Sequence, residues 1–241
     1  MTALSAYRSL EQQLSSELGL TRRPVAIAFA DAPPPGVAKF LGSVPSGCTF
    51  WRHASDGRVF FTVPGDHYNC PIGSYTHSMP LPADRAIELD QMLGLMSDIG
   101  YLRMEEVPDV PVLPKTPAVV VYAPLGDTPI EPDVVIFIGS AAGLMLVQES
   151  ATAAGIISNF STLGRPTCIA VPAALAGGLV VSSGCVGNRV YTDIGDGELY
   201  AALSGKDVAR LAAAAGRTAA ANAELQEYHR ARLEQLTAAS A

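Results

Sequence analysis

The sequence lacks any excess of basic charge. Sixteen Lys and Arg residues stand against 23 Asp and Glu residues, which gives a net charge of −7 at pH 7. Nucleic-acid binding depends on neutralising phosphates with Lys and Arg, so this balance argues against a nucleic-acid partner. Only 16% of the residues are charged and 49% are hydrophobic, which excludes a largely disordered chain.

The sequence also lacks a signal peptide and an uninterrupted membrane span. Its first 20 residues have the pattern of an amphipathic helix rather than a basic stretch followed by an apolar one, so we expect a cytoplasmic protein. The segment between Arg165 and Arg189 has no charged residue and is long enough to cross a bilayer. Pro172 and the pair Gly177-Gly178 divide it, so we expect short strands there and no membrane partner.

Apolar periodicity predicts a chain of alternating helices and strands. Predicted helices cover 5–19, 82–104, 140–154 (N-capped by Ser140) and 196 to the C-terminus. Predicted strands cover 24–29, 49–53, 58–63, 118–122, 134–138, 167–171, 179–182 and 189–192. We therefore predict an α/β fold, with helices on both faces of one sheet. Residues 1–205 form the predicted α/β unit, and 206–241 form an Ala-rich helical extension suited to a homo-oligomer contact.

Two stretches of the chain share an order of features that suggests an internal repeat. Cys48 to Gly73 and Cys168 to Gly187 each begin with Cys, continue through Ala, Gly and a short apolar run, and close with a second Cys. We interpret them as cysteine-bearing β-hairpins within pseudo-repeats at about 20–105 and 117–205, or as chance similarity between two hairpins. Residues that open and close a hairpin face each other, so each cysteine pair should lie close together. If the two repeats pack about a pseudo-twofold axis, all four thiols converge.

The four cysteines are the best candidates for chemistry. Disulfides are not expected in a reducing compartment, which leaves structural thiols, metal ligands and redox groups. Cys70 and Cys185 stand beside glycines, which let backbone amides approach a sulfur and lower the pKa of the thiol. Four cysteines suit an iron–sulfur cluster; zinc is an alternative, although the sequence has no short Cys-x-x-Cys knuckle. Cys48 and Cys168 are equally explained as small buried hydrophobic residues.

Histidines near Cys70 offer a second kind of chemistry. His67 precedes Cys70 by three residues, so the pair could form a nucleophile and base without a cofactor, or bind a metal together. His53 and His77 are expected in the same region, although a loop histidine is most often a solvated polar residue. Cys70-Pro71 is also similar to a short element of some haem-binding proteins, which makes haem another alternative.

Two further features have a functional and a structural interpretation. The stretch Gly139 to Gly143 joins a predicted strand to a helix and could hold an anion, but tight helix–strand packing explains its glycines more simply. Arg189 follows the second cysteine pair and could bind an anionic cofactor or substrate. Pairing with a surface carboxylate such as Asp193 or Asp196 is its structural alternative.

With these residues in view, the chain resembles the Domain of Unknown Function 169 family of bacterial and archaeal proteins. The resemblance covers about residues 7 to 205. It rests on PVAIAF, on Cys48 with the Ala-x-x-Gly that ends at Gly57, and on DHYNCPIGSYTH, PDVVIF, GRPTC and SGCVGNR. It implies that six residues occupy the family's motif positions, namely Cys48, His67, Cys70, Cys168, Cys185 and Arg189. It also implies an iron–sulfur cluster, which members of the family are sometimes suspected of binding.

These observations lead to one main hypothesis and two alternatives. The main hypothesis is a metal or iron–sulfur cofactor protein, with a redox or lyase-type activity on a small molecule and four cysteine ligands. One alternative is a cofactor-free thiol enzyme or sensor that uses Cys70 with His67. The other is a small-molecule binding protein, haem included, in which the cysteines serve packing.

Overall fold

The computed structural model describes residues 3–159 and 166–239. Seven strands form one sheet in the order β2-β3-β1-β4-β7-β6-β5. All neighbouring strands pair antiparallel except β5, which runs parallel to β6. The strands are β1 (Val25–Ala30), β2 (Phe60–Thr62), β3 (Val119–Pro124), β4 (Val134–Ser140), β5 (Ser158–Asn159), β6 (Leu179–Ser182) and β7 (Glu198–Ser204).

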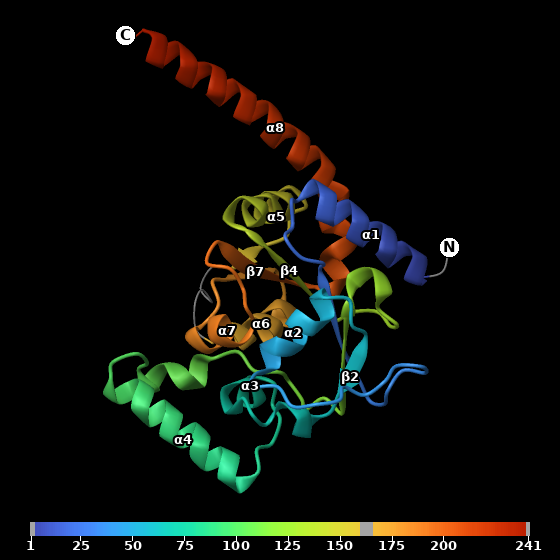
Figure 1. Ribbon diagram of the computed structural model, residues 1–241, viewed down its shortest axis with the longest axis vertical. Coiled ribbons are helices and arrows are strands. Elements are labelled where there is room, and N and C mark those ends of the chain that lie inside the picture. The colour runs from blue at the N-terminus through green and yellow to red at the C-terminus, as the bar shows by residue number, and fades with distance from the viewer. Residues whose placement is uncertain (1–2, 160–165, 240–241) are drawn as a thin grey trace.

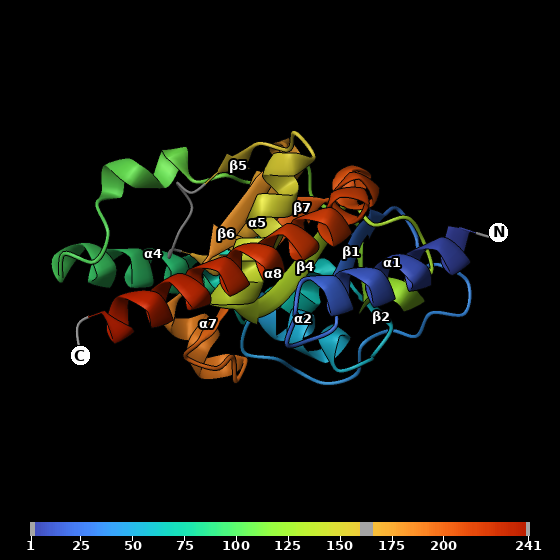
Figure 2. The ribbon, with the colours of Figure 1, turned by 90° about the horizontal axis from the view of Figure 1, so that it is seen from above.

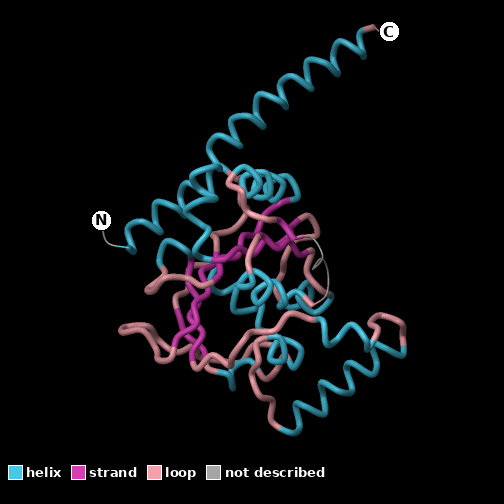
Figure 3. Tube along the Cα trace, turned by 180° about the vertical axis from the view of Figure 1, so that it is seen from behind, coloured by secondary structure: helices cyan, strands magenta, loops and turns pink. Residues whose placement is uncertain are grey.

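Helices cover both faces of this sheet, which confirms the predicted α/β fold (Figure 1; Figure 3 shows the sheet from behind). One face packs against α2 (Gly47–Ser55) and α6 (Ala170–Ala176). The other packs against α1 (Ala3–Glu17), α5 (Ala141–Ala153) and the first half of α8 (Val208–Ala238). Alternate side chains of the central strands enter the two cores, since successive residues of a strand point to opposite faces.

Two helices extend from this body. α4 (Ala83–Asp98) has no fully buried side chain, and α8 continues past its packed half into solvent (Figure 2). The remaining helices are short: α3 (Pro71–Thr76), α7 (Val186–Tyr191), and the 3-10 turns η1 (Pro64–His67), η2 (Met104–Asp109), η3 (Leu125–Asp127), η4 (Thr167–Ile169) and η5 (Gly205–Asp207). None of the helices in the described parts of the chain is long and apolar enough to cross a membrane.

The predicted cysteine hairpins are wrong. The strand predicted at 49–53 is helix α2, because Phe50, Trp51 and Ala54 bury their side chains at helical spacing. The strand predicted at 167–171 is η4 followed by the Ala-rich α6, in which Pro172 is tolerated because it lies in the first turn. The strand predicted at 189–192 belongs to helix α7.

Two helix boundaries also differ from prediction. The helix predicted at 82–104 ends as α4 at Asp98, and its apolar side chains Ile87, Leu95 and Ile99 are 57–67% exposed instead of packed. The helix predicted from residue 196 begins only at Val208, because residues 198–204 pair with both β4 and β6 as strand β7. Tertiary pairing outweighs the helix propensity of Leu and Ala in that segment.

The strand order is symmetric about its centre. β1 and β4 pair antiparallel there, β3 and β7 flank them, and β2 and β6 come next. In both halves, a helix with a cysteine at or just before its start precedes the outer strand, and a second cysteine follows that strand. A symmetric strand order can arise without duplication of an ancestral half, so the internal repeat stays a prediction.

Candidate functional site

The four cysteines lie at or near the starts of four helical segments on the same side of the sheet. Cys48 is in the first turn of α2 and Cys168 is in η4, with side chains 7% and 8% exposed. Cys70 is the N-cap residue of α3, and Cys185 is the N-cap residue of α7. All four are free thiols. We call the space around them the cysteine chamber.

The thiols are close enough to influence one another electrostatically. Burial, with smaller contributions from Cys70 and Cys185, raises the pKa of Cys48 to about 11. Burial also raises the pKa of Cys70, with a contribution from Cys185. The pKa of Cys168 lies well above the usual value because of burial and of the three other thiols. Every pair among the four cysteines is therefore within electrostatic reach.

Hydrogen bonds and packing hold the four cysteine segments beside one another. The Cys185 N–H donates to Thr167 Oγ1 at 2.5 Å and so joins α7 to η4. Ser46 Oγ lies 3.2 Å from the Cys48 sulfur at the start of α2. Gly47, Cys70 and Cys168 line one cavity, which brings α2, α3 and η4 together. The chamber is thus assembled from both halves of the chain.

Local hydrogen bonds position the individual sulfurs. The Asn188 N–H donates to the Cys185 sulfur at 3.4 Å, and the Gly73 amide group lowers the pKa of Cys70 against the effect of burial. An added Cβ at Gly73 would stand 3.0 Å from the Cys70 sulfur, so the sulfur would have to shift to make room for it. Among the described residues, no three His, Cys, Asp or Glu side chains already stand together as a group that could hold a metal ion.

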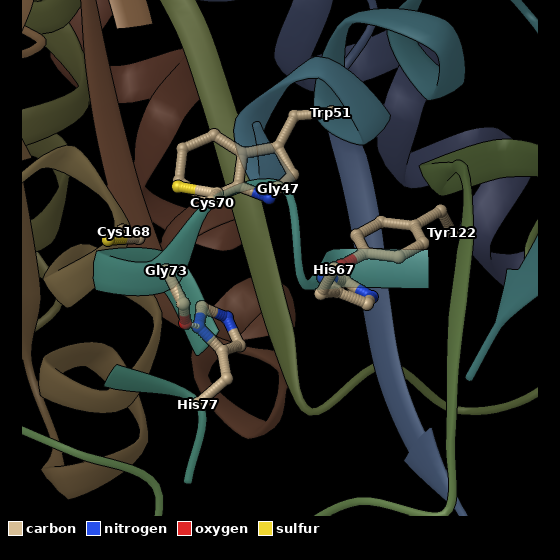
Figure 4. A pocket seen from close by; sticks show the side chains of 8 residues that line it. All are labelled: Gly47, Trp51, His67, Cys70, Gly73, His77, Tyr122 and Cys168. Atoms are coloured by element: carbon tan, nitrogen blue, oxygen red, sulfur yellow. Dashed lines mark hydrogen bonds between the residues drawn. The ribbon is translucent and has the colours of Figure 1, made fainter. Parts of the chain in front are cut away.

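A small cavity of about 10 Å³, room for roughly one water molecule, adjoins the chamber. Figure 4 shows Cys70 and Cys168 on one side of it, with His67 and Tyr122 on the other. The remaining lining residues are Gly47, Trp51, Gly73 and His77. No side chain that lines the cavity carries a full charge at neutral pH.

His67 and His77 are buried in the cavity wall as neutral imidazoles. Burial lowers the pKa of His67 to about 3, and the neighbouring His77 adds to this effect. Burial lowers the pKa of His77 to about 4 against the opposing hydrogen bond to Gly73. Their ring centroids are 6.4 Å apart. The thiolate–imidazolium pair considered for Cys70 and His67 is not favoured, because Cys70 has a raised pKa and His67 a lowered one.

Other candidate residues have structural partners. Arg189 donates hydrogen bonds to the backbone carbonyls of Ser183, Gly195 and Glu198 and so holds the loop beside Cys185, rather than pairing with Asp193 or Asp196. His53 packs its ring 5.2 Å from that of Phe40 and does not line the cavity. Arg165 lies outside the described residues.

The glycines between strand β4 and helix α5 serve packing. An added Cβ on Gly143 would stand 2.9 Å from the Leu18 carbonyl oxygen, and one on Gly139 would stand 2.8 Å from Leu144. Ser140 caps α5 by accepting a hydrogen bond from the Gly143 N–H at 3.1 Å. These close contacts favour the packing interpretation of the 139–143 stretch.

Sequence reasoning missed several residues of the site. The Asn188 N–H donates to the Cys185 sulfur at 3.4 Å, and Thr62 Oγ1 lies 2.8 Å from His67 Nε2. Tyr122 belongs to an apolar run that predicts a buried strand, which gives no sign of a site. Only the packing of β3 places it in the cavity wall. Gly47 and Trp51 are four residues apart, so in a helix they lie on one face. This spacing could have indicated that both line the same cavity.

Comparison with known proteins identifies one family. The model of the DUF169 family, described as Uncharacterised ArCR, matches residues 13–214 of the 241. This match includes all four cysteines, both cavity histidines and the complete sheet. No curated protein and no solved structure matches the chain.

Proposed function

Since this chain belongs to the DUF169 family, whose matched region contains the whole cysteine chamber, we propose that it is a thiol-ligated metal or iron–sulfur cofactor protein. The observation that carries the proposal is the convergence of four free thiols, from α2, α3, η4 and α7, on one side of the sheet and within electrostatic reach of one another. Clusters of ionisable groups with perturbed pKa values are more frequent at functional sites than elsewhere.

The chemistry of the donors fits a soft or borderline metal. Thiolates bind iron–sulfur clusters, zinc and copper(I), and a bound cation lowers the pKa of a coordinating thiol enough to remove its proton. Cys48, Cys70, Cys168 and Cys185 would hold such a group, and the backbone amides of Gly47, Gly73 and Asn188 would hydrogen-bond to the sulfurs. The side chains would have to move inward, because no metal-binding group stands preformed among the described residues.

The first experiment is anaerobic purification of the full chain, with a visible absorption spectrum and elemental analysis for iron, zinc and sulfide. We expect stoichiometric metal in the unaltered protein and its loss in Cys168→Ser. Ser150→Ala is the matched control, because it changes a small buried side chain on the opposite face of the sheet. A metal-free, colourless protein after anaerobic reconstitution would refute the proposal.

Three finer expectations belong to the same proposal. The first is a small-molecule ligand or substrate for a redox or lyase-type reaction, bound beside the thiols. The exposed second half of α8 supports a homo-oligomer. A cytoplasmic location is expected because free thiols persist in a reducing compartment.

A further inference from the structure

Asn188 of helix α7 has a buried hydrogen-bond acceptor without a partner. The residue is 1% exposed, and its Oδ1 accepts no hydrogen bond from any residue that the structure describes. Most buried polar groups in proteins have a partner, so an exception of this kind needs an explanation. Asn188 belongs to the cysteine chamber, since its backbone N–H donates to the Cys185 sulfur at 3.4 Å.

A closed set of hydrogen bonds fixes the direction in which the Asn188 amide points. The Thr192 hydroxyl donates to the Asn188 backbone carbonyl at 2.7 Å, so Thr192 Oγ1 can only accept from Tyr200 Oη, which lies 3.2 Å away. Tyr200 thereby uses its single proton, and it accepts from Asn188 Nδ2 at 3.0 Å. Because Nδ2 must face Tyr200, Oδ1 lies on the other side of the amide.

On that other side, Oδ1 lies against Gly184, the residue before Cys185. A Cβ built on Gly184 would stand 2.7 Å from Oδ1, and Gly184 adopts a φ of +83°. Gly184 and Cys185 are both partly exposed. Glycine tolerates the widest range of backbone conformations, so a small displacement of Gly184 is sufficient to admit a ligand to Oδ1 beside the Cys185 sulfur.

The surroundings of Oδ1 select the kind of ligand. An amide oxygen can only accept a hydrogen bond, so the ligand must supply an N–H or O–H donor. The neighbouring cation offers nothing to an anion, because the Arg189 guanidinium already donates to three backbone carbonyls. Burial of an unpaired charge is costly, so these features favour a neutral ligand over a carboxylate or a phosphate.

From this we infer that Asn188 is a ligand-binding residue, and that the chamber binds a small neutral molecule whose amide N–H or hydroxyl donates to Asn188 Oδ1 beside the Cys185 sulfur. The inference rests on the proposed function and names the chemical class of its small-molecule ligand. Primary amides and alcohols belong to this class.

The test is an NMR titration of the reduced, metal-free full chain, in which the backbone amide signals of Gly184 and Cys185 are followed. The probes are acetamide, acetone and acetate, which have nearly the same shape and differ in donor groups and charge. We expect acetamide to bind at least about 10-fold more tightly than acetone or acetate, because only acetamide supplies an N–H to Oδ1. Equal binding of acetamide and acetone, tighter binding of acetate, or no response to acetamide would each overturn the inference.

Variants assign the response to Asn188. Asn188→Leu keeps the approximate size of the side chain but lacks the acceptor, so acetamide should bind to it no more tightly than acetone does. Asn222→Leu is the matched control, since Asn222 lies in the extended half of α8 with Gln226 as its partner, and it should keep the preference for acetamide. A preference that persists in folded Asn188→Leu would also overturn the inference. The comparison of the three probes on the unaltered protein does not depend on whether a variant folds.

Elemental analysis of anaerobic preparations of the same protein separates this inference from the cofactor. Bound metal without a preference for acetamide would overturn the role of Asn188 and leave the proposed cofactor intact. A preference for acetamide in a protein that binds no metal would refute the cofactor and support the role of Asn188.

Discussion

Individual thiols and imidazoles in this protein are held in their uncharged forms by burial. The pKa of Cys48 is raised to about 11, while the pKa values of His67 and His77 are lowered to about 3 and about 4. Thiolate and imidazolium are therefore both disfavoured at neutral pH.

The two buried histidines predict how stability depends on pH in the metal-free protein. An unfolded histidine has a pKa of about 6.5, so below that pH the unfolded state binds more protons than the folded one. Stability should fall as the pH drops from about 6.5 towards the folded pKa values, by about 2 kcal/mol per histidine at about pH 5. Urea unfolding across this range measures the slope.

Variants separate these histidines from other acid-sensitive groups. His77→Gln should remove about half of the slope between neutral pH and about pH 5. His229→Gln, on the exposed end of α8, should leave it unchanged. Equal slopes in the unaltered protein and in His77→Gln would contradict the buried neutral state of His77.

At the scale of elements, the starts of helices position the chemistry. Cys70 and Cys185 precede α3 and α7, where the amide groups of the first turn face their sulfurs. The same role of a helix start is seen away from the site in α5, where Ser140 accepts from the Gly143 N–H. α5 also contains Ser150, whose buried hydroxyl has no hydrogen-bond partner within the described chain.

These two serines of α5 predict opposite effects of the same substitution. Ser140→Ala removes the N-cap and should cost about 1 kcal/mol of unfolding free energy. Ser150→Ala removes an unsatisfied buried hydroxyl and favours the helix, so it should stabilise by up to about 1 kcal/mol. Chemical denaturation of the two variants compares them directly. A loss of stability in Ser150→Ala would mean that its hydroxyl has a partner after all.

The whole molecule combines a two-faced body with an extended C-terminal helix. α8 buries Val208, Leu211 and Ala215 against the sheet, and its second half extends away from the body (Figure 1). In this extension Leu225, Tyr228 and Leu233 are 58%, 65% and 66% exposed. They form an apolar stripe of their own, in which only Leu233 lies in line with the buried Ala215.

We expect this stripe to pack on a second copy of the chain. Light scattering coupled to gel filtration should give twice the chain mass of 25.1 kDa. Leu225→Glu combined with Leu233→Glu should convert the dimer to a monomer without changing the thermal unfolding of the body, since neither side chain is buried within one chain. A protein that is monomeric at high concentration would exclude this contact.

Much of the sheet could be predicted, because buried strands such as PVAIAF and PDVVIF are continuous apolar runs bounded by proline and glycine. The cysteine segments were misassigned for an identifiable reason. Short apolar runs such as Thr49–His53 and Thr167–Val171 fit a strand or a helix turn equally well, and only packing against the sheet selects the helix. β7 was missed because its Leu and Ala residues favour a helix until β4 and β6 pair with it.

From the sequence alone we could predict an α/β fold, because apolar strand and helix patterns alternate along an apolar, mildly acidic chain. The sequence also identified four cysteines and a histidine three residues before Cys70 as candidates for chemistry. These predictions depend on local patterns, namely the spacing of apolar residues and the positions of glycine and proline. Only the tertiary structure decided that four cysteine segments from both halves meet on one side of the sheet, that His77 stands with His67 in a cavity wall, and that Arg189 binds backbone carbonyls. Those facts depend on contacts between residues distant in the chain, which no local pattern specifies.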